Sequence, residues 1–143
     1  MTPADRLVLD NSIAIAWCFA DEKDAYADGI AARFPRLEAW VPGLWPLEVA
    51  NALLMGERRG RSTQADTVTW TAFLAALPIV VDDETNANAW GHTLALARSQ
   101  NLSAYDAAYL ELAMRKGVPL ATLDNKLKAA AAAVGVPLYQ PPP

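Results

Sequence analysis

Two kinds of segment alternate along the chain. Short apolar runs predict strands, and longer stretches bounded by polar caps, prolines or glycines predict helices. The expected strands are residues 6–9, 39–41, 79–81 and 119–122, with a last edge strand at 136–139. The expected helices are residues 11–20, 21–34, 44–57, 62–77, 82–100, 103–116 and 124–134. This alternation predicts an α/β fold with a mainly parallel sheet covered by helices on both faces.

Prolines, glycines and helix caps set the expected boundaries. Asp21 is placed to cap the second helix, and Pro35 ends it. Pro46 falls in the first turn of a helix, where its missing N–H costs little. Gly117 stops the helix that precedes the fourth strand. The proline-rich tail, residues 140–143, cannot continue a sheet and is expected to be flexible.

Composition indicates one soluble domain. The 143 residues are 53% hydrophobic, which suits a single domain over residues 1–143 with a core of its own. Cys18 is the only cysteine, so a disulfide framework within the chain is excluded and a reducing compartment is indicated. No apolar run approaches the roughly 20 residues of a membrane helix. We therefore expect a cytoplasmic protein.

The net charge of −4 counts against a typical nucleic-acid binder, which has a basic surface. An acidic protein can still process RNA if some of its acids bind metal and a local basic patch steers the strand. One group of candidates is Arg58, Arg59 and Arg61, and a second is Lys126 with Lys128. Solvated helix ends explain both groups equally well.

Three aspartates have a functional interpretation and a simpler structural one. Asp10 and Asp124 each follow an expected strand, so both belong at the C-terminal edge of the sheet, where α/β proteins build their sites. Each also precedes a helix and could only cap it. Asp106 stands three residues after Ser103, which fits a capping box in which its carboxylate reaches back to an amide.

Glu48 is harder to explain structurally. It lies in an apolar helical stretch, and no Lys or Arg is within one helical turn of it. A carboxylate buried there would cost several kcal/mol unless it were paired or bound to metal. A salt bridge from elsewhere in the fold remains the alternative. Together with the three aspartates it would form an acidic cluster that needs a cation. With no cysteine or histidine cluster nearby, oxygen ligands favour Mg²⁺ or Mn²⁺ over zinc.

Four motifs extend this pattern and resemble one family. They are VLDNS at 8–12, PLEVANAL at 46–53, LSAYDAAYLELA at 102–113 and GVPLATLDNKL at 117–127. In order and spacing the chain resembles a PIN domain, specifically the VapC-type ribonuclease toxins of type II toxin–antitoxin systems. The likeness runs from about residue 6 to residue 139 and implies a three-layer α/β/α sandwich with a four- to five-stranded sheet.

The resemblance also implies an activity and partners. It implies a Mg²⁺-dependent endoribonuclease, with Mn²⁺ able to substitute, that forms a homodimer and is inhibited by a cognate VapB-like antitoxin. It assigns catalytic and metal-binding roles to Asp10, Glu48, Asp106 and Asp124, and it matches Ser12 and Thr122 to hydroxyl positions beside the acids. In the resulting mechanism Ser12, Thr122 and Asn125 support the acids or touch phosphate. Asn125 and Lys126 depart from the family pattern, because many relatives carry another acid there, and this leaves open whether one or two metals bind.

The expected reaction is hydrolysis of an RNA phosphodiester that leaves a 5′-phosphate and a 3′-hydroxyl. Two alternatives stay open: a metal-dependent phosphoesterase acting on DNA, and a degenerate PIN domain that binds without catalysis. Three aromatic residues, Trp17, Phe19 and Trp45, could line a groove for an antitoxin helix, although core packing explains them equally.

Overall fold

A four-stranded parallel sheet lies at the centre of the computed structural model, which describes residues 5–142. The strands are β1 (Asp5–Leu9), β2 (Leu37–Val41), β3 (Ile79–Val81) and β4 (Leu120–Ala121), in the order β3-β2-β1-β4. Val8 of β1 pairs with Trp40 on one side and with Leu120 on the other. The three buried residues of β1, Leu7–Leu9, are fully shielded from solvent, as expected for the inside of a parallel sheet.

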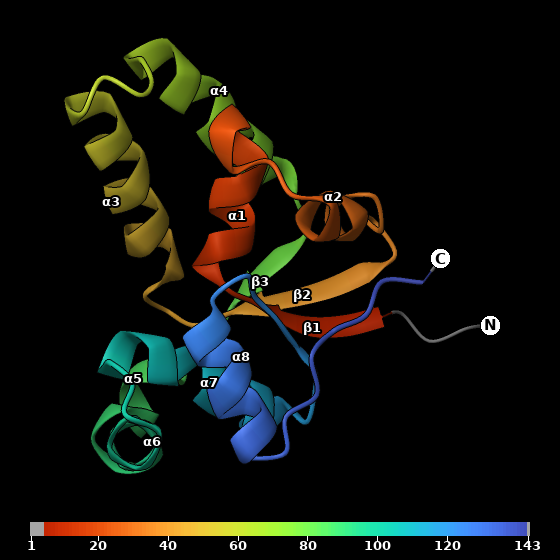
Figure 1. Cartoon of the computed structure of the whole chain (residues 1–143), viewed down its shortest axis with the longest axis vertical. Helices are drawn as coiled ribbons and strands as arrows, with labels where there is room; N and C mark the ends of the chain where they lie inside the picture. Colours follow the sequence, from red (N-terminus) through yellow and green to blue (C-terminus); the bar gives the residue numbers. More distant parts are fainter. Residues whose placement is uncertain (1–4, 143) are drawn as a thin grey trace.

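Helices cover both faces of the sheet (Figure 1). On one side lie α1 (Asn11–Cys18), α2 (Ala25–Ala31), α3 (Trp45–Arg58) and α4 (Gln64–Ala76). On the other side lie α5 (Thr85–Asn88), α6 (Leu94–Gln100), α7 (Ala104–Lys116) and α8 (Asn125–Ala133), with a π-helical turn η2 (Ala89–Thr93) between α5 and α6. This arrangement confirms the predicted three-layer α/β/α fold. None of the described helices is long and apolar enough to cross a membrane.

The second predicted helix begins later than expected. Asp21 belongs to a short 3₁₀ turn, η1 (Ala20–Glu22), and Asp24 caps α2 instead by accepting hydrogen bonds from the amides of Tyr26 and Ala27 at 2.8 and 3.2 Å. An aspartate three residues further along offered the same capping chemistry, and sequence alone did not distinguish the two.

Two other predicted elements are shorter than expected. The helix predicted from residue 82 begins at Thr85, because the Asp82 carboxylate accepts from the Glu84 amide and the Thr85 hydroxyl and forms a turn. The predicted edge strand at 136–139 is reduced to one bridge between Leu138 and Leu120. Residues 140–142 of the predicted flexible tail lie outside helices and strands.

The aromatic residues proposed to line an antitoxin groove belong largely to the core. Phe19 and Trp45 are 3% and 8% exposed. Trp17 is partly buried, and its indole N–H donates to the carbonyl of Ala27 at 2.7 Å. Core packing, one of the two explanations that the sequence left open, therefore accounts for Phe19 and Trp45.

Candidate active site

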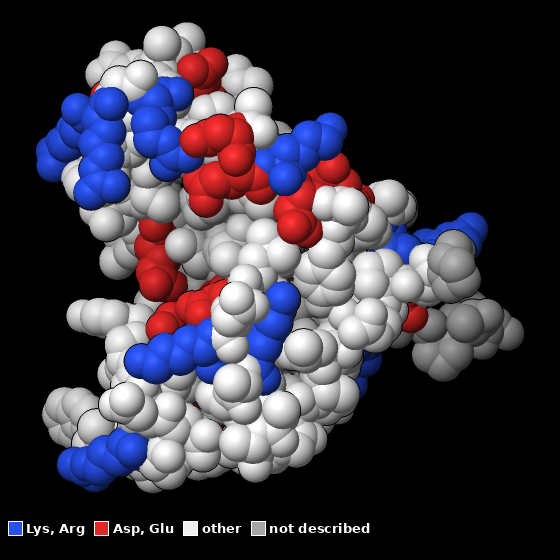
Figure 2. Space-filling view, in the orientation of Figure 1, with Lys and Arg blue, Asp and Glu red and all other residues white. Residues whose placement is uncertain are grey.

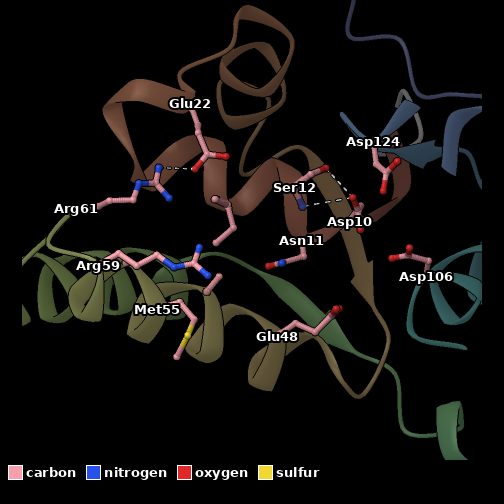
Figure 3. A pocket seen from close by; sticks show the side chains of 13 residues that line it. Asp10, Asn11, Ser12, Glu22, Glu48, Met55, Arg59, Arg61, Asp106 and Asp124 are labelled. Atoms are coloured by element: carbon pink, nitrogen blue, oxygen red, sulfur yellow. Dashed lines mark hydrogen bonds and ion pairs between the residues drawn. The ribbon is translucent and has the colours of Figure 1, made fainter. Parts of the chain in front are cut away.

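A cavity of about 450 Å³ opens where the C-terminal ends of β1 and β4 meet α1, α3 and α7. Five carboxylates, two guanidinium groups, two polar side chains and a floor of apolar or small residues line it. In chain order they are Asp10, Asn11, Ser12, Ile15, Glu22, Glu48, Ala52, Met55, Gly56, Arg59, Arg61, Asp106 and Asp124. All four acids predicted from the sequence thus face one cavity, and Figure 3 shows them approaching it from four different elements.

Asp10 is 5% exposed and both caps α1 and faces the cavity. Its Oδ2 accepts hydrogen bonds from the Ser12 hydroxyl at 2.6 Å, the Thr122 hydroxyl at 2.8 Å and the Ser12 amide at 3.3 Å. Oδ1 accepts no hydrogen bond from the described residues. The structural and functional interpretations of Asp10 are therefore compatible, because they use different oxygens. Ser12 and Thr122 lie beside the acid, as the resemblance implied.

The two carboxylate oxygens of Asp124 also have different contacts. Its Oδ1 caps α8 by accepting from the amides of Lys126 and Leu127 at 2.9 and 3.3 Å. Oδ2 has no hydrogen-bond partner in the described part of the chain. β1 ends directly before Asp10, and β4 ends three residues before Asp124, so both aspartates lie at the same edge of the sheet.

Asp106 forms only half of the capping box that its spacing suggested. The Ser103 hydroxyl accepts from the Asp106 amide at 3.0 Å, but within residues 5–142 the Asp106 carboxylate does not bond back to the Ser103 amide. The carboxylate instead lines the cavity (Figure 3). Burial and then the charge of Asp124 raise the pKa of Asp106, while Lys126 offsets part of the rise.

Glu48 is half-buried, not deeply buried as its apolar helix suggested. The outer face of α3 is open to solvent, and the neighbouring Leu47 is 76% exposed. The partner of Glu48 is the hydroxyl of Tyr109, which donates to its Oε1. Tyr109 is fully buried in α7, one turn after Asp106. Sequence reasoning missed Tyr109, although a buried tyrosine hydroxyl needs a partner and this residue shares a helix face with Asp106.

Charges among the four predicted acids raise the pKa values of Asp10, Glu48 and Asp106, and none of the four has a cationic partner in the described part of the chain. Burial is the main cause that raises the pKa values of Asp10 and Glu48, and the charge of Asp106 raises both further. Among the described residues no Lys or Arg forms an ion pair with any of the four predicted acids. A bound cation would supply the missing positive charge.

The side chains present fit an oxygen-ligated divalent cation. Besides the carboxylates, the amide oxygen of Asn11 is buried at the cavity without a hydrogen-bond partner in the described structure. Hard oxygen donors without sulfur or imidazole are the set that Mg²⁺ and Mn²⁺ prefer. Asn125 is exposed and is not part of the cavity lining, so Asn11 is nearer to the predicted role than Asn125 is.

A second acidic group lies elsewhere, between β3 and α5. Oxygens of Asp82, Asp83 and Glu84 all lie within 4.8 Å of one another, the only such trio among the described residues. The four cavity acids are therefore spread more widely. Arg115 binds Asp82 with two nitrogens, at 2.7 and 3.1 Å, and also reaches Glu84 and Glu111.

A protein-family model matches most of this chain. The PIN domain model matches residues 7–133, nearly the whole chain. The chain belongs to the PIN domain family. This confirms the resemblance drawn from the four motifs, and all four predicted site acids of this PIN domain fall within the matched range.

Two solved structures share the fold. The crystal structure of PAE2754 from Pyrobaculum aerophilum is 25% identical with a TM-score of 0.65, covering 89% of this PIN domain and 80% of that chain. The crystal structure of VapBC2 from Rickettsia felis, bound to a DNA fragment from their promoter, is 14% identical with a TM-score of 0.62. It covers 94% of this chain and 97% of that chain. A search of curated proteins gives no significant match.

Proposed function

We propose that this PIN domain is a Mg²⁺-dependent endoribonuclease, the toxin of a type II toxin–antitoxin pair. The observation that carries the proposal is the cavity, where four carboxylates gather, have no cationic side chain as partner and are joined by the unpartnered Asn11 oxygen. The family membership and the likeness to VapBC2 of Rickettsia felis support it. Cytoplasmic location, a homodimer and inhibition by a VapB-like antitoxin belong to the same proposal.

The chain's own groups have distinct tasks in this proposal. The free oxygens of Asp10 and Asp124, with the Asp106 carboxylate, would hold the ion, and Ser12 and Thr122 fix the orientation of Asp10. When bound, Mg²⁺ would supply charge stabilisation for the phosphoryl oxygens and lower the pKa of a water.

Glu48 would orient the attacking water and accept its proton on Oε2, while the Tyr109 hydroxyl holds Oε1. Burial raises the pKa of Glu48, so its carboxylate is a stronger base than an exposed glutamate. Direct ligation of the ion by Glu48 is the other role that its position allows, and both roles require the same ionised side chain.

Substitution of the acids tests the proposal. Purified protein would be incubated with RNA and with DNA of the same sequence, in Mg²⁺, Mn²⁺ or EDTA. We expect RNA cleavage that needs the metal and falls at least about 100-fold in Asp10→Asn and Asp106→Asn. Asp10→Asn keeps the cap of α1, because asparagine caps a helix about as well as aspartate does.

Asp83→Asn is the matched control, because it removes one exposed carboxylate from the acidic group outside the cavity. It should cleave at the unaltered rate. Cleavage that survives Asp106→Asn in a folded protein would refute the site assignment. Cleavage of DNA alone would favour a DNA phosphoesterase, and the absence of both cleavage and Mn²⁺ binding by calorimetry would favour a non-catalytic binding module.

A further inference from the structure

The cavity continues beyond the acids along one face of α3. Glu48, Ala52, Met55, Gly56 and Arg59 all line it, at the spacing of neighbours on a single helix face. Glu48 and Arg59 are eleven residues apart, which is three turns and about 16 Å along the helix axis. The cavity therefore has an acidic end and a basic end, joined by an apolar floor (Figure 3).

Arg61, one of the two cations at the basic end, is already neutralised. Its guanidinium binds Asp21 at 3.0 Å and Glu22 at 2.9 Å, and it lies 4.3 Å above the centre of the Phe19 ring. The absence of a side chain on Gly56 permits this arrangement, because a Cβ there would lie 2.6 Å from the Phe19 ring. Arg61 is thus part of the cavity wall.

Arg59 is different. It lines the cavity and is exposed, yet within residues 5–142 it forms no ion pair and no side-chain hydrogen bond. Figure 3 shows its side chain running from α3 into the cavity, beside the Arg61–Glu22 pair and toward Asn11. Figure 2 shows Lys and Arg side chains gathered over the far end of α3, directly bordered by Asp and Glu side chains, with further acidic side chains nearer the other end of the helix. Because the N–H groups of this guanidinium have no partner among the described residues, they are available for bidentate recognition of a phosphate.

We propose that Arg59 binds a second backbone phosphate of the nucleic-acid strand, more than one nucleotide away from the phosphate positioned at the acidic end. The inference rests on the proposed nuclease function and adds a binding subsite to it. The apolar floor of Ala52 and Met55 would lie under the nucleotides between the two phosphates. Because the protein's net charge is −4, the attraction of an anionic strand depends on a local cation in the same cavity as the acids.

The test compares two adjacent arginines. Arg59→Gln removes the cavity cation, and Arg58→Gln removes an exposed charge from the last residue of α3 that does not line the cavity. Binding of a fluorescent single-stranded RNA would be measured at several salt concentrations, with Ca²⁺ in place of Mg²⁺ and the RNA checked for integrity. Cleavage would be measured separately in Mg²⁺.

We expect Arg59→Gln to weaken binding about tenfold at low salt and to reduce the slope of log K against log salt by about 0.7. Arg58→Gln should leave the slope unchanged. Arg59→Lys should keep the slope, because it keeps the charge, while losing part of the affinity with the bidentate geometry.

Equal slopes for Arg59→Gln and the unaltered protein would overturn the subsite even if RNA is cleaved, and the proposed function would then stand alone. A slope difference without any cleavage would support the subsite and overturn the nuclease proposal. An equal loss of slope in Arg58→Gln would show general charge steering and would also overturn it.

Discussion

Two groups of acids in this PIN domain each contain one aspartate that is almost fully buried, but only one of these aspartates has a cationic partner in the described structure. Asp82, in the group around Arg115, is 4% exposed, and Asp10, in the cavity, is 5% exposed. Hydrogen bonds from Arg115 lower the pKa of Asp82, whereas burial raises the pKa of Asp10 because its hydroxyl partners only partly compensate. The two side chains are equally shielded from solvent, but within residues 5–142 only Asp82 has a cationic partner, and that partner sets the direction of its pKa shift.

The comparison also shows that close spacing of acids does not by itself indicate a metal site. The tight trio at 82–84 looks like a ligand set, but Arg115 occupies the position that an ion would take. Among the described residues, no Lys or Arg pairs with the four predicted acids of the cavity. A group in which several acids have raised pKa values is a better indication of a ligand-binding site than close spacing of acids is.

Removal of Arg115 should have the largest effect. Arg115→Met leaves Asp82 and the 1% exposed Glu111 buried without their partner, and we expect a loss of about 3–5 kcal/mol in the free energy of unfolding. Urea denaturation at neutral pH measures it.

Arg98→Met, on an exposed site of α6 without an ion pair among the described residues, is the control and should change the stability by less than about 0.5 kcal/mol. A similarly small loss in Arg115→Met would contradict the view that this cation is what stabilises the second acidic group.

Tyr109→Phe should have a smaller effect that is confined to the cavity. It removes the hydrogen bond to Glu48 and should cost about 1 kcal/mol of stability, since Glu48 is half-exposed and water replaces part of the bond. Because Glu48 also loses its orientation, Mn²⁺ affinity measured by calorimetry should fall several-fold.

Tyr26→Phe provides the matched control. The Tyr26 hydroxyl donates to the Tyr139 carbonyl at 2.6 Å, away from the cavity lining. Its loss should cost a similar amount of stability and leave Mn²⁺ affinity unchanged. Equal Mn²⁺ affinities in both variants would mean that Tyr109 serves the fold alone.

The smallest expected effect concerns how the stability of the metal-free protein depends on pH. Asp106 and Asp82 should change this stability in opposite directions. The pKa of Asp106 is raised above its ordinary value of 3.8, so the folded state holds this proton longer than the unfolded chain does. As pH rises through that window, Asp106 therefore reduces stability, and Asp106→Asn should stabilise the protein at pH 7 by a few tenths of a kcal/mol. The pKa of Asp82 is lowered instead, so Asp82 stabilises the fold at pH values above its ordinary pKa. This contribution is lost as the pH falls.

Urea denaturation in EDTA at pH 4 and pH 7 measures the difference between the unaltered protein and Asp106→Asn. It should grow with pH. Asp83→Asn, at an exposed position, should follow the unaltered protein at both pH values. A gap that shrinks as pH rises would contradict the sign assigned to Asp106.

The sequence was sufficient for what local patterns and strand direction determine. Four strands and the convergence of Asp10 and Asp124 followed from apolar runs that end in aspartate, because parallel strands share one C-terminal edge. Contacts between distant segments were not accessible in this way. Arg115 reaches Asp82 across 33 residues, and Tyr109 reaches Glu48 across 61 residues.

The error on Glu48 had a different origin. Its apolar neighbours suggested a buried helix, but α3 leaves Leu47 and Leu54 exposed at 76% and 40%. Periodicity reports which residues share a face, and it does not report which face the rest of the protein covers. Asn125, the first residue of α8, is exposed and does not line the cavity, so its predicted contact with phosphate stays a prediction.

The two oxygens of the Asp10 carboxylate have different contacts, and this affects which point mutations the protein can tolerate. One oxygen serves the helix and the other faces the cavity, and asparagine can replace only the first task. Aspartate and asparagine codons differ by a single base, so one point mutation would silence the cavity while leaving a folded protein. The same holds for Asp124 at α8. Forms of this chain with an altered cavity should therefore arise readily and persist as folded proteins instead of being lost to misfolding.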